Sequence, residues 1–276
     1  VALYQAKDSG RNIVRFFNPD MQAVIDARTS MESALRRALL KGDLHLYYQP
    51  QVDQHGRLIG AEALLRWLPL DAEPIQPTHF IPLAESTGLI LPIGKWVLDT
   101  ALVELKSWET QPDKAALRLS VNVSARQFQQ TDVVSQICDS LARSGANPAR
   151  LKLELTESAV LSNVEESIHR MHELRRMGIT FALDDFGTGY SSLAYLKRLP
   201  LDQVKIDQSF VQDLSHDAND AAIVRAILAM SHSLSLHVIA EGVETEAQRA
   251  FLIENGCTDF QGFLFGKPLP MHRWER

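Results

Sequence analysis

The stretch Leu151-Lys152-Leu153-Glu154-Leu155 alternates apolar and polar residues with a period of two. This period is typical of a β-strand, so the side chain of Glu154 points to the face opposite the leucines. A second apolar run, residues 179–183, ends in the same way and is followed by Asp184. Strand-like runs that end in isolated polar residues are the pattern on which the fold prediction rests.

The same polar ending recurs along the whole chain, and amphipathic helical stretches separate the runs. The polar residues are Glu62, Asn122, Glu154, Asp184, Glu241 and Gln261, with Asp185 and Lys205 beside them. Repeated strand–helix units predict an α/β fold, and in a parallel barrel all strand carboxyl ends open on one face, where such residues converge. Oxygen ligands, with few histidines and no clustered cysteines, suit hard divalent cations. The residues therefore predict a metal-assisted enzyme.

Length and composition are consistent with one large domain. The chain has 276 residues, of which 45% are hydrophobic, and a single α/β barrel of about 250 residues is ordinary. The net charge of −6 argues against binding to a DNA or RNA duplex, which requires a basic face. The isolated Cys138 and Cys257 fit a reducing cytoplasm. No apolar run approaches the roughly 18–20 residues of a membrane span, although a longer parent protein could carry an anchor.

The periodicity also predicts where the strands and helices lie. Strands are expected near residues 44–52, 58–66, 117–123, 150–156, 179–184, 203–206, 236–240 and 258–260. Helices are expected near residues 29–41, 78–86, 92–109, 130–144, 163–177, 190–198, 219–233 and 245–254. The start at 29 rests on Thr29 or Ser30 as a helix cap.

The first 27 residues differ in kind from the rest. Residues 1–12 have the pattern of the last turns of a helix that Gly10 ends, and a short strand is expected through Phe17. We therefore predict a connector over residues 1–27 and the main domain over residues 28–276.

Seven ordered segments carry a resemblance to a known family. They are Glu62–Arg66, Ser120–Ser124, Glu154–Ser158, Asp184–Ser192, Lys205–Asp207, Glu241–Thr245 and Gln261–Gly262. Together they resemble the EAL domain, the phosphodiesterase that hydrolyses cyclic di-GMP, over roughly residues 28–271. The first stretch resembles the C-terminal end of a GGDEF (diguanylate cyclase) domain, which often precedes an EAL domain, but the Gly-Gly-Asp-Glu-Phe signature itself is absent.

The resemblance implies a fold, an activity and a context. The fold is a modified TIM-type (β/α)₈ barrel with one antiparallel strand, a detail that the periodicity does not predict. The activity is hydrolysis of cyclic di-GMP to the linear dinucleotide pGpG in bacterial second-messenger signalling. It would require two Mg²⁺ or Mn²⁺ ions and be inhibited by Ca²⁺. The implied context is cytoplasmic, with a homodimer formed near the Asp185–Ser191 loop and upstream GGDEF and possibly sensory domains.

The resemblance also implies residue roles. The metal ligands are Glu62, Asn122, Glu154, Asp184, Asp185 and Glu241; the substrate contacts are Gln49, Arg66 and Gln261; and the catalytic residues are Lys205, Glu241 and Glu157. Glu157 would brace the loop that follows Asp185. The sequence leaves open whether Lys205 or Glu241 is the general base, although a lysine among carboxylates is favoured as a cation. The alternative is a catalytically inactive EAL-type receptor or protein-interaction module, and the complete motif set favours the enzyme.

Overall fold

The computed structural model describes residues 19–70, 72–187, 193–214 and 217–274. The predicted helix and strand within residues 1–17, and the part of the Asp185–Ser191 loop from residue 188 on, lie outside these ranges. The chain forms two compact units. The smaller unit contains residues 1–45 and 66–90, and the larger unit contains residues 46–65 and 91–276.

The smaller unit is built on two helices, α2 (Pro19–Lys41) and α3 (Pro77–Thr87). Arg28 of α2 donates to the hydroxyl of Ser86 in α3 (2.9 Å), and the Trp67 and Phe80 rings pack edge to face. The predicted helix start at residue 29 is wrong, since α2 begins at Pro19. Proline suits the first position of a helix, where its missing N–H is not needed. The boundary between residues 27 and 28 stays a prediction.

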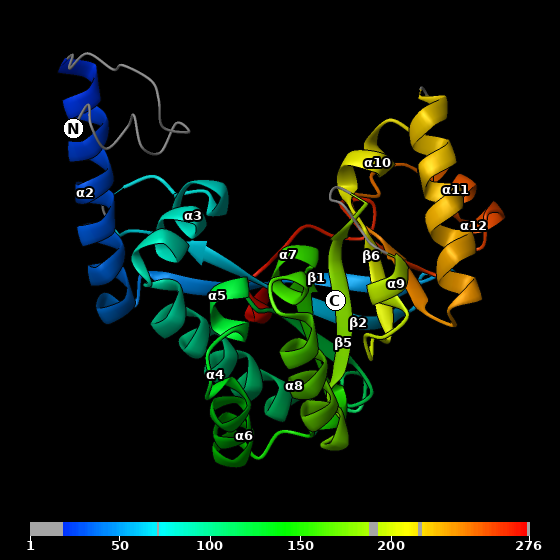
Figure 1. Ribbon diagram of the computed structural model, residues 1–276, viewed down its shortest axis with the longest axis horizontal. Helices are drawn as coiled ribbons and strands as arrows, with labels where there is room; N and C mark the ends of the chain where they lie inside the picture. The colour runs from blue at the N-terminus through cyan, green and yellow to red at the C-terminus, as the bar shows by residue number, and fades with distance from the viewer. Residues whose placement is uncertain (1–18, 71, 188–192, 215–216, 275–276) are drawn as a thin grey trace. The chain divides into compact units, whose positions relative to one another are not determined.

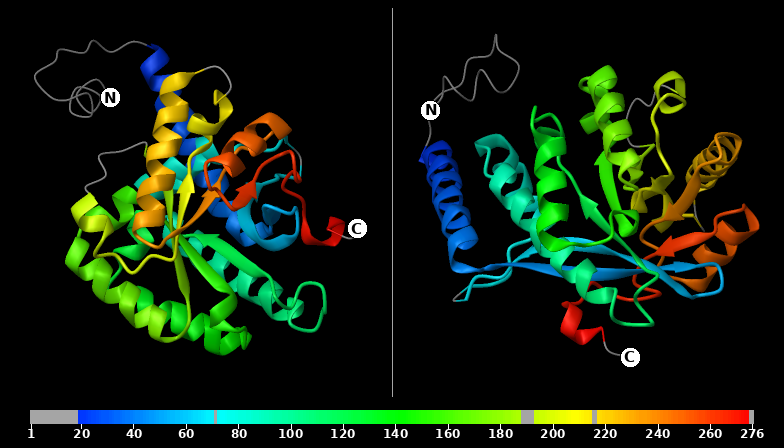
Figure 2. Two further views of the ribbon diagram at one scale, coloured as in Figure 1. Left: turned by 90° about the vertical axis from the view of Figure 1, so that its right-hand side faces the viewer. Right: turned by 90° about the horizontal axis from the view of Figure 1, so that it is seen from below.

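The strands form a closed barrel and follow one another in chain order. The strands are β1 (Leu44–Asp53), β2 (Leu58–Trp67), β3 (Arg118–Asn122), β4 (Leu151–Thr156), β5 (Thr180–Phe186), β6 (Gln203–Ile206), β7 (His237–Ala240) and β8 (Asp259–Gln261). All of them belong to the larger unit except for the first two residues of β1 and the last two of β2. Strands β2 to β8 pair in parallel, whereas β1 pairs with β8 in the antiparallel direction, with Gln51 opposite Gln261. This topology confirms the predicted modified barrel with one antiparallel strand (Figures 1 and 2).

Helices connect successive strands of the larger unit. They are α4 (Ile90–Trp108), α5 (Ala125–Phe128), α6 (Val133–Ser144), α7 (Glu157–Leu161), α8 (Val164–Arg176), α9 (Leu193–Leu196), α10 (Gln208–Gln212), α11 (Ala218–Ser233) and α12 (Glu246–Glu254). Three short helices, α5, α7 and α10, were not predicted; each has only four or five residues, too few to show a clear period, although the equally short α9 lies within the helix expected near residues 190–198. Among the described residues, no helix combines the length and the apolar character that crossing a bilayer requires.

The barrel strands bury both faces, and each face has its own chemistry. On β4 the side chains of Leu151, Leu153 and Leu155 are fully buried, as the period of two predicts. Lys152 and Glu154 alternate with them and are also buried. Apolar burial on the leucine face supplies the main favourable term in folding. The opposite face is left to polar side chains.

Candidate active site

A single ammonium group lies at the centre of the predicted site. Lys205 of β6 is 1% exposed, and its Nζ contacts a carboxylate oxygen from each of four other chain segments. The partners are Glu241 (2.7 Å), Asp184 (3.0 Å), Glu62 (3.5 Å) and Glu154. The structure thus brings together four of the acids that the sequence placed at strand ends.

Amide side chains form a second set of contacts around Glu62. Asn122 donates to Oε1 of Glu62 (2.6 Å), and Gln261 donates to its Oε2 (2.6 Å). The same Nε2 of Gln261 donates to Gln49 (3.1 Å), while Oε1 of Gln261 accepts from Gln51 (2.9 Å). Three predicted site residues, Gln49, Asn122 and Gln261, are therefore joined to Glu62 in one network.

Close backbone packing places Gln261 in this network. Gly262 follows it, and a Cβ atom at that position would meet the backbone of Val243 at 2.1 Å. The chain after β8 therefore approaches the loop after β7 as closely as only glycine allows. This contact explains the Gln261–Gly262 pair that the sequence singled out.

The site has four carboxyl groups around one ammonium group, so its negative charge is only partly compensated. Burial raises the pKa of Glu154 to about 7, and repulsion from Glu62 and Asp184 adds to this. Burial and the neighbouring acids also raise the pKa of Glu241 well above its usual value. The pKa of Glu62 is lowered, since Lys205 and the amide donors outweigh its burial. For Lys205 the surrounding carboxylates, Asp184 foremost, outweigh burial and raise the pKa, so it remains an ammonium ion.

The donor set fits a hard divalent cation. Oε1 of Glu154 is buried and has no hydrogen-bond partner within the described ranges. A buried carboxylate oxygen in an excess of negative charge is a favourable ligand for such an ion. As the side chains stand, they close on Lys205, and no three His, Cys, Asp or Glu side chains of the described residues are arranged to hold a metal.

A cavity of about 400 Å³ opens over this cluster. Its wall includes Gln49, Glu62, Asp184, Asp185, Lys205, Asp207, Gln208, Glu241, Glu244, Gln261 and Phe263. Asp207 had no predicted role, although it directly follows β6 and so shares the strand-end signal of the other acids. Arg66 belongs to the smaller unit, and its contact with substrate stays a prediction.

Asp185 departs from ordinary strand geometry. Its φ of 54° lies in the left-handed region, and the pairing of β5 with β6 shifts register between Leu183 and Phe186. Partial burial and repulsion from Asp184 and Asp207 raise its pKa to about 6. Strained backbone of this kind is concentrated at functional sites. The strand thus presents two consecutive acids at one edge, which strict alternation would not allow.

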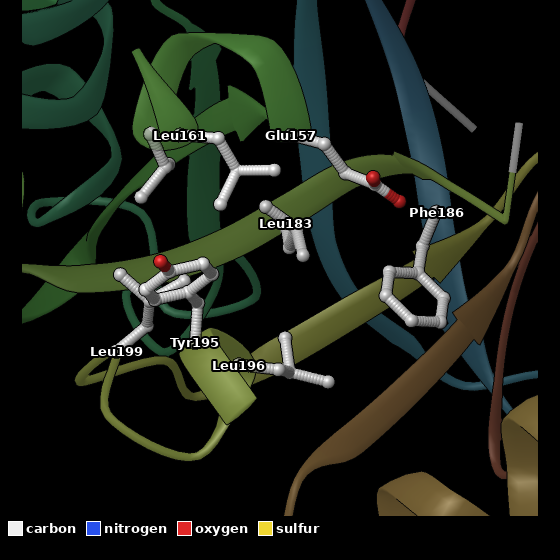
Figure 3. A pocket seen from close by; sticks show the side chains of 8 residues that line it. Glu157, Leu161, Leu183, Phe186, Tyr195, Leu196 and Leu199 are labelled. Carbon is white, nitrogen blue, oxygen red and sulfur yellow. The ribbon is translucent and has the colours of Figure 1, made fainter. Parts of the chain in front are cut away.

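Glu157 lies beside the end of β5. The N–H of Gly187 donates to its Oε1 (3.3 Å), and Gly187 has a φ of 100°. Figure 3 shows the Glu157 carboxylate directed toward Phe186, above a small apolar pocket that Leu183 and Leu196 also line. The contact agrees with the predicted bracing role as far as residue 187, and the role itself stays a prediction.

Known proteins resemble the chain over nearly its whole length. The sequence profile of the EAL domain matches residues 32–268. Bifunctional diguanylate cyclase/cyclic di-GMP phosphodiesterase MucR of Pseudomonas aeruginosa is 46% identical over 270 residues, covering 98% of this chain and 39% of that protein. Cyclic di-GMP phosphodiesterase PdeR of Escherichia coli is 38% identical over 276 residues, covering 100% of this chain and 41% of that protein. The chain therefore spans about two fifths of the length of these curated relatives.

Solved structures share the fold. The MucR phosphodiesterase in complex with c-di-GMP superposes with a TM-score of 0.86 at 45% identity, covering 89% of this chain and 100% of that one. The EAL enzyme Bd1971 in its cGMP-bound form gives a TM-score of 0.87 at 31% identity, covering 92% of this chain and 70% of that one.

Removing the ammonium of Lys205 is expected to destabilise the barrel. Lys205→Met leaves buried carboxylates without their cation, which costs about 3–5 kcal/mol of the free energy of unfolding. The measurement is urea denaturation at neutral pH in the presence of a chelator. Lys95→Met is the control, because Lys95 makes an exposed pair with Asp99 worth under about 1 kcal/mol. Equal losses for the two variants would contradict the central role of Lys205.

Removing the Glu157 carboxylate is expected to increase local opening of the backbone at the end of β5. Glu157→Ala takes away the acceptor of the Gly187 N–H, so hydrogen exchange at Gly187 is expected to accelerate. Glu254→Ala, at the end of α12, serves as the control. Exchange at Gly187 that matches the control would count against the bracing contact.

Proposed function

The chain belongs to the EAL domain family, and we propose that it is a divalent-metal-dependent phosphodiesterase that opens cyclic di-GMP to the linear dinucleotide pGpG. The observation that carries the proposal is the convergence of four carboxylates on Lys205 beneath a cavity of about 400 Å³. The names of the relatives MucR and PdeR, both cyclic di-GMP phosphodiesterases, support it, as does the c-di-GMP complex of the MucR domain.

The charge of the cluster requires cations for this reaction. A cyclic dinucleotide carries two anionic phosphates, and an acid cluster alone would repel them. When bound, two Mg²⁺ or Mn²⁺ ions would neutralise this charge and activate the attacking water. Glu62, Asn122, Glu154 and Asp184 would hold one ion, and Asp185 with Glu241 would reach the other.

Lys205 acts as a charge partner and not as the base. Its Nζ is surrounded by carboxylate oxygens, which stabilise the protonated form. It therefore keeps the ligands of separate strands together and contributes positive charge near the phosphate. The proton that the attacking water loses would pass to the carboxylate of Glu241, and the same group would return it to the 3′ oxygen released from phosphorus.

Three residues would hold the substrate. Gln49 and Gln261 line the cavity and carry amide groups that suit the polar edges of guanine and ribose. Arg66, four residues after Glu62 on β2, would bind a phosphate oxygen through its guanidinium group.

The parent protein supplies the wider context of the proposal. The chain spans about two fifths of its curated relatives, so upstream GGDEF and sensory domains are part of what we propose. A homodimer formed near the Asp185–Ser191 loop and a cytoplasmic location of the domain complete it.

Hydrolysis is expected to depend on the strand-end acids. Asp184→Asn removes a charge where several kcal/mol of stabilisation is concentrated, so turnover of cyclic di-GMP is expected to fall at least ~100-fold. The measurement is pGpG formation by purified protein with Mg²⁺. Asp139→Asn, on the exposed face of α6, is the control. Wild-type protein that binds cyclic di-GMP without producing pGpG would instead establish the receptor alternative.

The choice of metal is expected to separate binding from turnover. Mg²⁺ or Mn²⁺ is expected to support hydrolysis, because these ions take compact octahedral geometry at about 2.0–2.1 Å for Mg²⁺. Ca²⁺, with ligands at about 2.3–2.6 Å, is expected to permit binding and block turnover. Affinity and pGpG formation are measured with each ion. Equal turnover with Ca²⁺ and Mg²⁺ would refute the two-metal proposal.

A further inference from the structure

A second polar cavity lies at the other end of the barrel. It has a volume of about 420 Å³, and its wall includes residues with which parallel strands begin. Arg118 opens β3, Gln203 opens β6, His237 opens β7 and Asp259 opens β8. The acid cluster lies at the carboxyl ends of the same strands, so the two cavities occupy opposite mouths of the barrel.

The two cavities are lined by side chains that lie on the same faces of β4 and β6, at two different heights along the strands. Lys152 precedes Glu154 by two residues on β4, and Gln203 precedes Lys205 by two on β6. Since side chains two residues apart point to the same face of a strand, the lower layer is polar for the same geometric reason as the upper one. The balance of charge differs, however: the upper layer sets four carboxylates against Lys205, whereas the cations of the lower cavity, Arg118, Arg150 and Lys152, outnumber its acids, Asp202 and Asp259.

Lys152 is the central residue of the lower layer. It is 6% exposed, and its Nζ donates to Oε1 of Gln203 (2.6 Å). Within the described part of the chain it makes no ion pair and no other hydrogen bond, although an ammonium group has three donors. Burial lowers its pKa, against the attraction of Glu154 and Asp259. The ammonium therefore has unused donors at a buried position, and an anionic ligand in the cavity would satisfy them.

Two arginines add to the positive charge. Arg118 is exposed at the rim, and Arg150 is held in place by a bond from its Nη1 to the carbonyl of Ala116 (2.7 Å). The wall also holds two acids: Asp202 pairs with Arg175 (3.0 Å), and Asp259 accepts from the neutral amide of Gln203 (3.2 Å), which does not cancel its charge. The Gln203 amide thus bonds to both Lys152 and Asp259, and Arg118, Arg150 and Lys152 still outnumber the two acids, in a chain of net charge −6.

We propose that this cavity binds a phosphate group, with Lys152 at its base and Arg118 at its rim. A tetrahedral oxyanion accepts several N–H donors at once and suits the ammonium and guanidinium groups that face the space. The volume suits a small ligand, since such pockets span about 300–1,000 Å³. Free phosphate and a phosphomonoester such as 5′-GMP share this chemistry. The site is independent of the hydrolysis proposed for the acid cluster.

Calorimetric titration of the chain with inorganic phosphate, and separately with 5′-GMP, in the presence of a chelator tests the proposal. We expect saturable binding of at least one of them, weakened at least about tenfold by Lys152→Met and by Arg118→Gln. Whichever ligand binds identifies the source of the phosphate group. Arg143→Gln, an exposed arginine paired with Asp99, is the matched control and is expected to leave binding unchanged.

Two further measurements keep the test decisive. Asp184→Asn is expected to retain phosphate binding, because the acid cluster does not take part. Arg118 is exposed, so Arg118→Gln is expected to fold even if Lys152→Met does not, and circular dichroism of each variant checks this. The proposal is overturned if neither ligand binds, if Arg118→Gln leaves binding unchanged, or if Asp184→Asn abolishes it.

Discussion

The attraction between the Lys205 ammonium and the carboxylates around it is the interaction on which the rest of the structure depends. Like charges brought to one face of a barrel repel one another, and burial removes the water that would screen them. The ammonium compensates part of this charge and ties β6 to acids of β4 and β5 and to Glu241, which follows β7. It leaves the rest uncompensated, and this remainder is what an incoming cation would find.

Stability and chemistry are divided between the two faces of the same strands. On β4 the leucines supply buried apolar area, while Lys152 and Glu154 alternate with them and face the interior. This division explains why so much could be predicted from the sequence. A period of two fixes the face of each residue, and the carboxyl ends of parallel strands meet by topology, so Glu62, Glu154 and Asp184 could be expected together before any distance was known.

The rest depends on tertiary contacts that no local pattern encodes. The sequence did not predict that the acids close on Lys205, or that Gln51 joins the amides around Glu62, since both depend on the stagger of the barrel. The start of α2 was predicted too late, because Thr29 and Ser30 were interpreted as helix caps. The helix begins at Pro19. The presence of one antiparallel strand was implied by the family resemblance alone, because periodicity carries no information on strand polarity, and the structure identifies this strand as β1.

The amide of Gln261 is bonded at both of its ends, and this fixes which end faces which neighbour. Its nitrogen donates to Glu62 and Gln49, and its oxygen accepts from Gln51. Turning the amide by half a revolution would set nitrogen against nitrogen at Gln51 and oxygen against oxygen at Glu62, which loses every one of these bonds. Gln49 and Gln51 of β1 and Glu62 of β2 therefore together favour one orientation of the Gln261 amide. Glu62 thus meets the donor end of Gln261, and this bond helps the Lys205 ammonium and Asn122 to lower the pKa of the Glu62 carboxyl group.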